Sequence, residues 1–267
     1  MVLGAQVLGV GTAYTGLYYS WYKQYNTGQF DFFDDSEEWL QMDKAGHFVT
    51  AFHLARAGAG MYRWAGRNEE DAAKAGYFFS IAFLTGVEIM DGFSEGWGFS
   101  IADFRSNVAG ASLFLFQDYF LKDKPISLKF SYHNSPFAQY RPELLGSSGT
   151  DRWLKDYNGQ TYWLGLNLKS IMGRNCYIPE WVSLAFGYGA EGMTGGSRNP
   201  EKNAAGMQIP VFKRERQFYF SPDIDLWRIK WKSRWMEKIC NTFGFIKVPL
   251  PALELKSGKM FFHPLYF

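Results

Sequence analysis

Three pairs of polar residues in the first half of the sequence have the spacing of a single helix face. The pairs are Asp43 with His47, Glu88 with Asp91, and Asp103 with Asn107. Side chains three or four residues apart on a helix point in the same direction. If the three faces converge, they form a polar pocket. Its histidine and carboxylates could bind zinc, manganese or iron, or perform general acid and base catalysis.

The metal hypothesis and a structural alternative both remain open. The possible ligands of a divalent metal are Asp43, His47, Glu88 and Asp103. Their spacing matches no diagnostic ligand motif such as HExxH, so the pattern alone names no cofactor. The alternative is a network of hydrogen bonds that fixes the register of the helices, with Asn107 packed near Gly110.

Buried carboxylates must be compensated, because an isolated buried charge is costly. Lys44 and Arg105 are the nearest basic residues in the sequence. Each directly neighbours a member of a pair, so we expect its side chain to point away from the shared face. His47, a bound cation or shared protons would then compensate the acids.

Helical periodicity predicts the elements that position these pairs. Asp43 begins one helix, Asn68 caps a second, and Ser100 or Asp103 opens a third that ends near Phe120. The first 22 residues carry no charge and predict another helix, either embedded in a bilayer or buried in a core. Its small residues predict close contact with another helix; they are Ala5, Gly9, Ala13, Thr12, Gly16 and Ser20.

The second half changes to the alternating pattern of strands. About five strands are expected, within residues 126–133, 161–170, 181–191, 217–229 and 252–267, with a short amphipathic helix at 233–244. We therefore predict an α+β fold, in which an N-terminal helical bundle packs with a C-terminal antiparallel, aromatic-rich sheet, or a partial barrel. Residues 1–122 would be the helical half and 123–267 the strand-rich half of one integrated unit.

The amino-acid composition limits the kinds of partner and the cellular compartment that we expect. The 28 Lys and Arg nearly balance the 26 Asp and Glu, so no basic surface for nucleic acid is indicated. Aromatic residues make up 19% of the chain, which fits either a lipid interface or a large aromatic core. Cys176 and Cys240 are too few for a disulfide framework, and whether they pair is left open.

The order of the motifs DKAGHF, GVEIMDGFSEGWGFS and DFRSNVAGA resembles the YfiM-like family of envelope lipoproteins, a domain of unknown function. It is also similar, more distantly, to the VanZ-like membrane proteins. The resemblance covers about residues 38–116 and implies a shared polar site without a known reaction. The residues it carries over are Asp43, Lys44, His47, Glu88, Asp91, Asp103 and Asn107, with Gly110 as a tight-packing position. A lipoprotein cysteine near the start is absent from this sequence.

These observations lead to three hypotheses about function. The first is an envelope protein, at the outer membrane or its periplasmic face, that binds or handles an envelope lipid or glycan through the polar pocket. The second is a membrane-associated enzyme that uses His47 and the carboxylates as acid, base or metal ligands. The third is a structural accessory subunit of an envelope complex. Membrane lipid, another envelope component or an envelope protein would be the partner.

Overall fold

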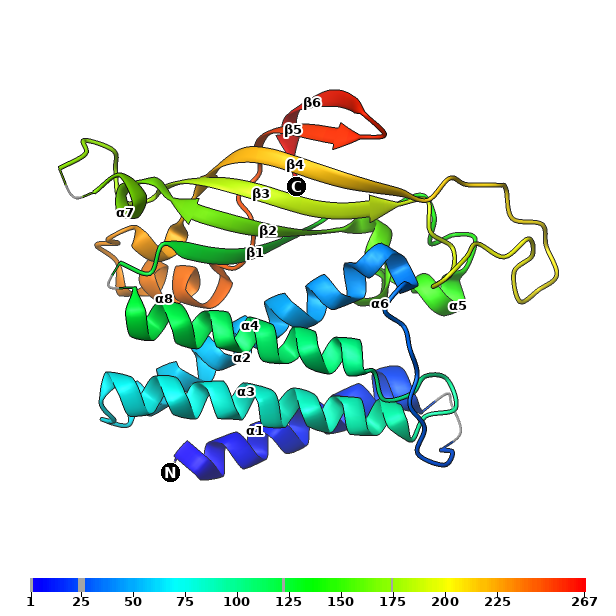
Figure 1. Cartoon of the computed structure of the whole chain (residues 1–267), viewed down its shortest axis with the longest axis horizontal. Coiled ribbons are helices and arrows are strands. Elements are labelled where there is room, and N and C mark those ends of the chain that lie inside the picture. Colours follow the sequence, from blue (N-terminus) through cyan, green and yellow to red (C-terminus); the bar gives the residue numbers. More distant parts are fainter. Residues whose placement is uncertain (1, 24–26, 122, 174) are drawn as a thin grey trace. The chain divides into compact units, whose positions relative to one another are not determined.

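The computed structural model describes residues 2–23, 27–121, 123–173 and 175–267 (Figure 1). The chain divides into two compact units, each built from two stretches of sequence. The first contains Met1–Ser36 and Lys44–Lys122, and the second contains Glu37–Asp43 and Asp123–Phe267. The first unit is helical and the second contains an antiparallel sheet, so the predicted α+β class is confirmed.

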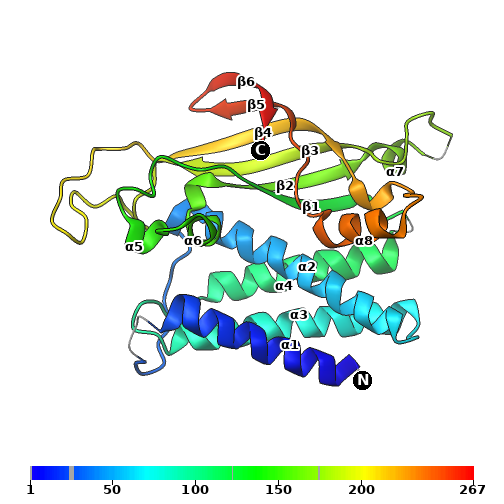
Figure 2. The same ribbon diagram turned by 180° about the vertical axis from the view of Figure 1, so that it is seen from behind.

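The helices of the first unit occur in the predicted order (Figure 2), and two of them have clear start signals. Asn68 and Ser100 cap two of them, because their side chains accept hydrogen bonds from the backbone N–H of Asp71 and Asp103. The elements are α1 (Val2–Leu17) with a π-helical turn at Tyr18–Tyr22, α2 (Met42–Trp64), α3 (Glu69–Gly92) and α4 (Ile101–Phe120).

The prediction that α1 packs closely through its small residues is wrong where the structure describes it. Gly9, Thr12, Ala13 and Gly16 are exposed, and a Cβ atom added at Gly9 or Gly16 would meet nothing within 4 Å. The side chains of Ala5 and Ser20 lie outside the described part. Polar contacts hold α1 instead: the Tyr14 hydroxyl donates to the Phe83 carbonyl, and Gln6 Oε1 accepts from the Tyr62 hydroxyl at 3.0 Å.

Within the described residues, α3 is the one helix that is long and apolar enough to cross a membrane. Only 28% of its most apolar stretch is buried, and Phe78 is 66% exposed. Length and composition alone do not distinguish a membrane span from a core helix.

The second unit is built on a six-stranded antiparallel sheet in which the strands follow one another in chain order (Figure 1). The final alternating segment contributes two strands rather than one, because Ser257 and Gly258 form a tight turn with positive φ. The strands are β1 (Ile126–Tyr132), β2 (Gln160–Asn167), β3 (Val182–Glu191), β4 (Glu215–Ile224), β5 (Leu250–Lys256) and β6 (Lys259–Tyr266). The sheet is open, with β1 and β6 at its edges.

Short helices and turns connect these strands. They are α5 (Pro142–Leu145), α6 (Gly149–Lys155), a 3₁₀ turn at Tyr157–Gly159, α7 (Leu168–Met172), a second 3₁₀ turn at Leu226–Arg228, and α8 (Arg234–Phe243). The helix α8 confirms the amphipathic helix predicted there. Cys176 and Cys240 are both free.

One face of the sheet is apolar, and it is exposed on β2 to β6 but buried at Leu128 on β1, which is 3% exposed. A complete row across all six strands consists of Leu128, Leu164, Phe186, Phe220, Leu253 and Phe262. Phe186 is 47% exposed and Phe262 is 64% exposed. Because side chains alternate along a strand, the opposite face holds the intervening residues, and these are mostly small or polar.

The opposite face is buried although it carries charges. Lys129 and Lys247 both pair with Asp223, at 2.6 and 3.5 Å, and all three side chains are at most 1% exposed. The last strand curls over this face, so that the Tyr266 hydroxyl lies 2.9 Å from the Thr161 Oγ1. The buried face of the sheet is therefore mostly polar and its exposed face is mostly apolar. In a sheet of a water-soluble protein, the apolar face is normally buried and the polar face meets water.

The stretch Glu37–Asp43 packs with the sheet. Trp39, Leu40 and Gln41 form a 3₁₀-like turn with positive φ, which residues other than glycine rarely adopt. Partners distant in sequence hold this turn: the Tyr188 hydroxyl donates to the Leu40 carbonyl, and Arg216 donates to the Gln41 side chain at 2.5 Å. A fully buried cluster of Met42, Ala190 and Met193 lies beside it.

Candidate functional site

The polar residues of the first unit meet where α2 lies against α3 and α4. Gly76 and Gly110 allow this approach: a Cβ atom at Gly110 would lie 2.0 Å from the Phe48 carbonyl oxygen, and one at Gly76 would lie 2.3 Å from that of Ala55. With backbones this close, even short polar side chains on the three helices can reach one another.

Lys44 is the cation of the site, contrary to the expectation that its side chain would point away. Its ammonium group lies 2.6 Å from Asp35 Oδ2 and 2.8 Å from Asp103 Oδ1, and its side chain is only 11% exposed. The long, flexible side chain reaches round the helix, so the direction of the Cα–Cβ bond did not predict where the charge would lie.

Asp35 and Ser100 also belong to this site, although residue spacing predicted neither as a site residue. The Ser100 hydroxyl donates to Asp35 at 2.5 Å and also accepts from the Asp103 backbone N–H at 3.0 Å. Ser100 was recognised only as a helix cap. Asp35 lies in an acidic stretch with no helical spacing, so no local pattern connects it with a residue 68 positions later.

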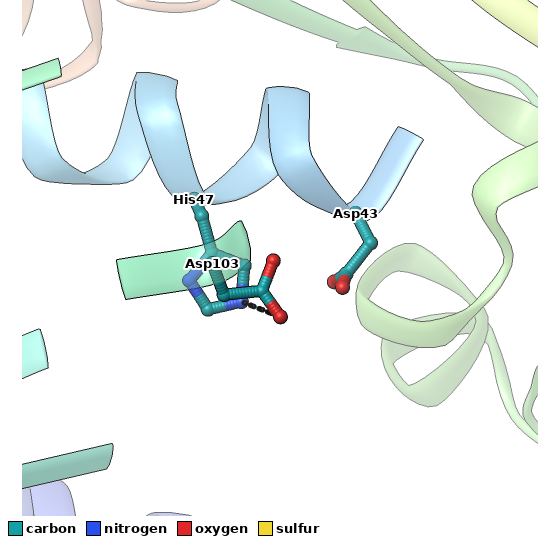
Figure 3. A group of neighbouring side chains, drawn as sticks. All are labelled: Asp43, His47 and Asp103. Carbon is teal, nitrogen blue, oxygen red and sulfur yellow. Dashed lines mark ion pairs between the residues drawn. The ribbon is translucent and has the colours of Figure 1, made fainter. Parts of the chain in front are cut away.

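His47 lies between polar groups from α3 and α4. Its Nδ1 atom is 3.1 Å from the Asn107 Oδ1 and 3.4 Å from the Glu88 Oε1. Its Nε2 atom is 3.9 Å from the Asp103 Oδ2 (Figure 3). The Asn107 amide also donates to Glu88 at 3.1 Å. The structure thus brings together His47, Glu88, Asp103 and Asn107, as the convergence of the helix faces predicts.

Asp91 interacts with the N-terminal segment. The Tyr22 hydroxyl donates to the Asp91 Oδ1 at 2.7 Å. Burial raises the pKa of Tyr22 strongly, and the negative charges of Asp91 and Glu88 raise it further, so this hydroxyl remains a hydrogen-bond donor at neutral pH. Tyr22 is an additional member of the site that residue spacing did not reveal.

Asp43 precedes His47 by one turn of α2, and the helix itself sets this separation (Figure 3). A carboxylate oxygen of Asp43 lies within 4.8 Å of a ring nitrogen of His47. Asp43 also accepts a hydrogen bond of 2.5 Å from the Tyr157 hydroxyl. Its carboxylate is therefore oriented by a residue of the sheet-containing unit, to which Asp43 itself belongs.

The arrangement gives His47 two chemical options. A protonated imidazolium would lie near both Glu88 and Asp103 and would stabilise these buried carboxylates, which belong to residues only 1% and 4% exposed. A neutral imidazole could instead supply a nitrogen ligand beside carboxylate oxygens, a donor set that suits zinc, manganese or iron. Either state also permits proton transfer to a bound molecule.

The other histidines lie elsewhere. His53 packs its ring edge-on against Phe52. In the second unit, His263 lies 2.6 Å from Glu254, which also accepts from Gln217 at 2.9 Å. Residue spacing predicted no such polar group on the sheet, because its members come from three different strands.

The match to a known family coincides with this site. Residues 31–118 match the model of a family described as a predicted periplasmic lipoprotein, DUF2279. This range includes Asp35, Lys44, His47, Glu88 and Asp103. No curated protein and no solved structure matches the chain. Over these residues the chain is therefore similar to a cell-envelope family of unknown function, which supports an envelope location.

Proposed function

We propose that this protein acts at the outer membrane, or on its periplasmic side, and binds or handles an envelope lipid or glycan through the polar cluster of α2, α3 and α4. The observation that carries the proposal is the position of His47, whose two ring nitrogens face polar groups on two different helices. Closer kinship with the YfiM-like and VanZ-like proteins is part of this proposal.

The chemistry of the cluster suits such a ligand. Carboxylates, an amide and an imidazole can accept or donate hydrogen bonds to sugar hydroxyls, and the carboxylates can also bind an amino group of a lipid headgroup or amino sugar. The acidic side chains of Glu88, Asp91 and Asp103 favour such neutral or cationic groups over a bare phosphate.

Binding measurements test the proposal directly. The purified full chain would be titrated with phosphatidylethanolamine in detergent micelles and, separately, with soluble amino-sugar fragments of the cell wall. We expect His47→Gln and Glu88→Gln to weaken binding of the cognate class about tenfold or more, because each removes a charged or ionisable partner. The matched control is His53→Gln, which makes the same change on the same helix.

Equal affinities for the wild-type protein and both cluster variants, with all proteins folded, would contradict the proposal. If neither ligand class binds, and the variants lose only thermal stability, the cluster serves to fix the register of the helices. The protein would then be a structural accessory subunit.

An enzyme is the second candidate, and it is favoured by the His47 and Asp103 pair. Nε2 of His47 is 3.9 Å from the Asp103 carboxylate, and Asp43 is one turn away on α2 (Figure 3). Such groups could hold a divalent metal or act as acid and base. Metal analysis of the protein purified without chelators, compared with His47→Ala, separates the two ideas. A stoichiometric metal that is lost in the variant favours the enzyme.

A further inference from the structure

The helix α8 in the second unit exposes its apolar face. Trp235 is 76% exposed, Ile239 48% and Phe243 52%, and these residues recur at helical spacing. Cys240, at the margin of this face, is the buried residue of the helix. An amphipathic helix of a soluble domain normally turns its apolar side toward the core. In α8 the apolar side faces outward, as expected for a helix that contacts an external apolar phase.

Basic residues accompany this apolar face. Residues 226–243 contain five basic side chains and one acidic side chain, Glu237. Four of the basic residues are exposed: Lys230, Lys232, Arg234 and Lys238. Lys238 and Arg234 lie on the polar side of α8, next to the apolar arc. This combination of exposed Trp and Ile with lysine and arginine is complementary to a surface that is apolar inside and anionic outside.

A second group of exposed apolar residues lies at the same end of the sheet. Both views show α7 and α8 at this end (Figures 1 and 2). Ile171 and Met172 at the end of α7 are 59% and 63% exposed, and Tyr177 in the following loop is fully exposed. Aromatic and aliphatic side chains at the end of a sheet are typical of contact with the boundary between headgroups and hydrocarbon.

The chain after α8 connects this end with the apolar face of the sheet. The Phe130 backbone N–H donates to the Phe245 carbonyl, and the Lys247 N–H donates to the Phe130 carbonyl. Ile246, which is 41% exposed, therefore pairs with Phe130 and extends a row of apolar side chains on the exposed face of the sheet. Ile246 thus connects the end of α8 with the partly exposed Phe130 of β1, next to the buried Leu128.

We propose that α8 is a membrane-binding helix that lies in the interface of an anionic phospholipid bilayer. Trp235, Ile239 and Phe243 enter the acyl region, and Lys232 and Lys238 contact lipid phosphates. The surface belongs to the sheet-containing unit and involves none of the residues around His47, so it stands independently of the ligand-binding proposal.

Flotation of the purified full chain with lipid vesicles tests this role. One set of vesicles contains phosphatidylglycerol and phosphatidylcholine in equal parts, and the other contains phosphatidylcholine alone. We expect tighter binding to the anionic vesicles, weakened by salt. The variants Trp235→Ser/Ile239→Ser and Lys232→Glu/Lys238→Glu should each lower affinity for the anionic vesicles about tenfold or more. The control Asn241→Ser, on the polar side of α8, should bind like the wild-type protein.

Other apolar helices could also bind vesicles, but that binding would not depend on lipid charge. The difference in affinity between the two kinds of vesicle therefore excludes their contribution. Far-ultraviolet circular dichroism verifies that the variants are folded. Wild-type affinity for anionic vesicles in both double variants would overturn the proposal. It would also be overturned if the wild-type protein forms a dimer that the Trp235→Ser/Ile239→Ser variant dissociates in the absence of lipid, because α8 would then bind a second copy of the chain.

Discussion

At the scale of single residues, the candidate site depends on how Lys44 and His47 share the surrounding acids. Lys44 contacts Asp35 and Asp103, while His47 lies nearer to Glu88. The ammonium group of Lys44 and the imidazole of His47 are thus placed within a single turn of α2. Lys44 is therefore placed to compensate Asp35 and Asp103, whereas His47 is placed to compensate Glu88.

Replacing Lys44 tests its part in the cluster. Lys44→Gln leaves two largely buried carboxylates without their cation, so we expect the free energy of unfolding to fall by about 3 kcal/mol. Urea denaturation at neutral pH measures this. The matched control, Lys74→Gln, breaks an exposed pair with Glu70 and should leave the free energy of unfolding nearly unchanged, because water screens this pair. Equal small losses in both variants would show that Lys44 does not compensate the acids.

His133 provides a prediction about pH. Burial lowers its pKa below the ordinary value of 6.5, although Asp156, Glu191 and Glu254 partly oppose the shift. In the unfolded chain His133 takes up a proton near pH 6.5, whereas the folded protein resists protonation until lower pH. The unfolded state then binds more protons, and stability falls as the pH drops below 6.5.

The comparison between the wild-type protein and His133→Gln isolates this contribution. Melting temperatures measured from pH 7.5 down to pH 5 (roughly the range over which histidine titrates) should fall more steeply for the wild-type protein. Parallel curves for the two proteins would contradict the assignment.

At the scale of elements, glycines determine how closely the helices of the first unit approach. Gly110 of α4 touches the backbone of α2, whereas Gly60 of α2 has open space where a Cβ atom would lie. The same residue type therefore has opposite consequences at the two positions. Close approach at Gly110 is what allows Asn107, one turn earlier, to reach His47.

Substitution by alanine should separate the two positions. Gly110→Ala forces α2 and α4 apart, and we expect a loss of about 1–3 kcal/mol of stability from overpacking, together with weaker binding at the cluster. Gly60→Ala should raise stability by roughly 0.5–1 kcal/mol, because alanine favours the helix and meets no obstacle. Thermal melts of the two variants check both signs, and a tolerated Gly110→Ala would rule out the tight contact.

At the scale of the whole molecule, envelope location has the broadest support. The family match describes periplasmic lipoproteins, and exposed apolar side chains occur on α3, on α8 and on the sheet. We expect the protein to fractionate with membranes and to require detergent for release, because these surfaces favour lipid over water. Cell fractionation with alkaline carbonate washing measures this. Recovery in the soluble fraction without detergent would contradict it.

Local patterns predicted the elements well because their causes are local. Asn68 and Ser100 cap helices through residues three positions away, and strict alternation identified the strands. The shared helix faces likewise brought His47 and Asn107 together. Local patterns did not predict features that depend on contacts between distant residues. Lys44 turns toward Asp35, which lies in a loop, and the turn at Leu40 with its positive φ is held by Tyr188.

The division of the chain into units affects the order in which the protein can fold. Met42 belongs to the core of the sheet-containing unit, beside Ala190 and Met193, yet the helix that it begins continues into the other unit. Since synthesis proceeds from the N-terminus, Met42 emerges long before its packing partners exist. The first turn of α2, with Asp43, can therefore pack only after the strands in the middle of the sheet have been synthesised. A fragment that ends at residue 122 would lack the contacts that hold this turn in place.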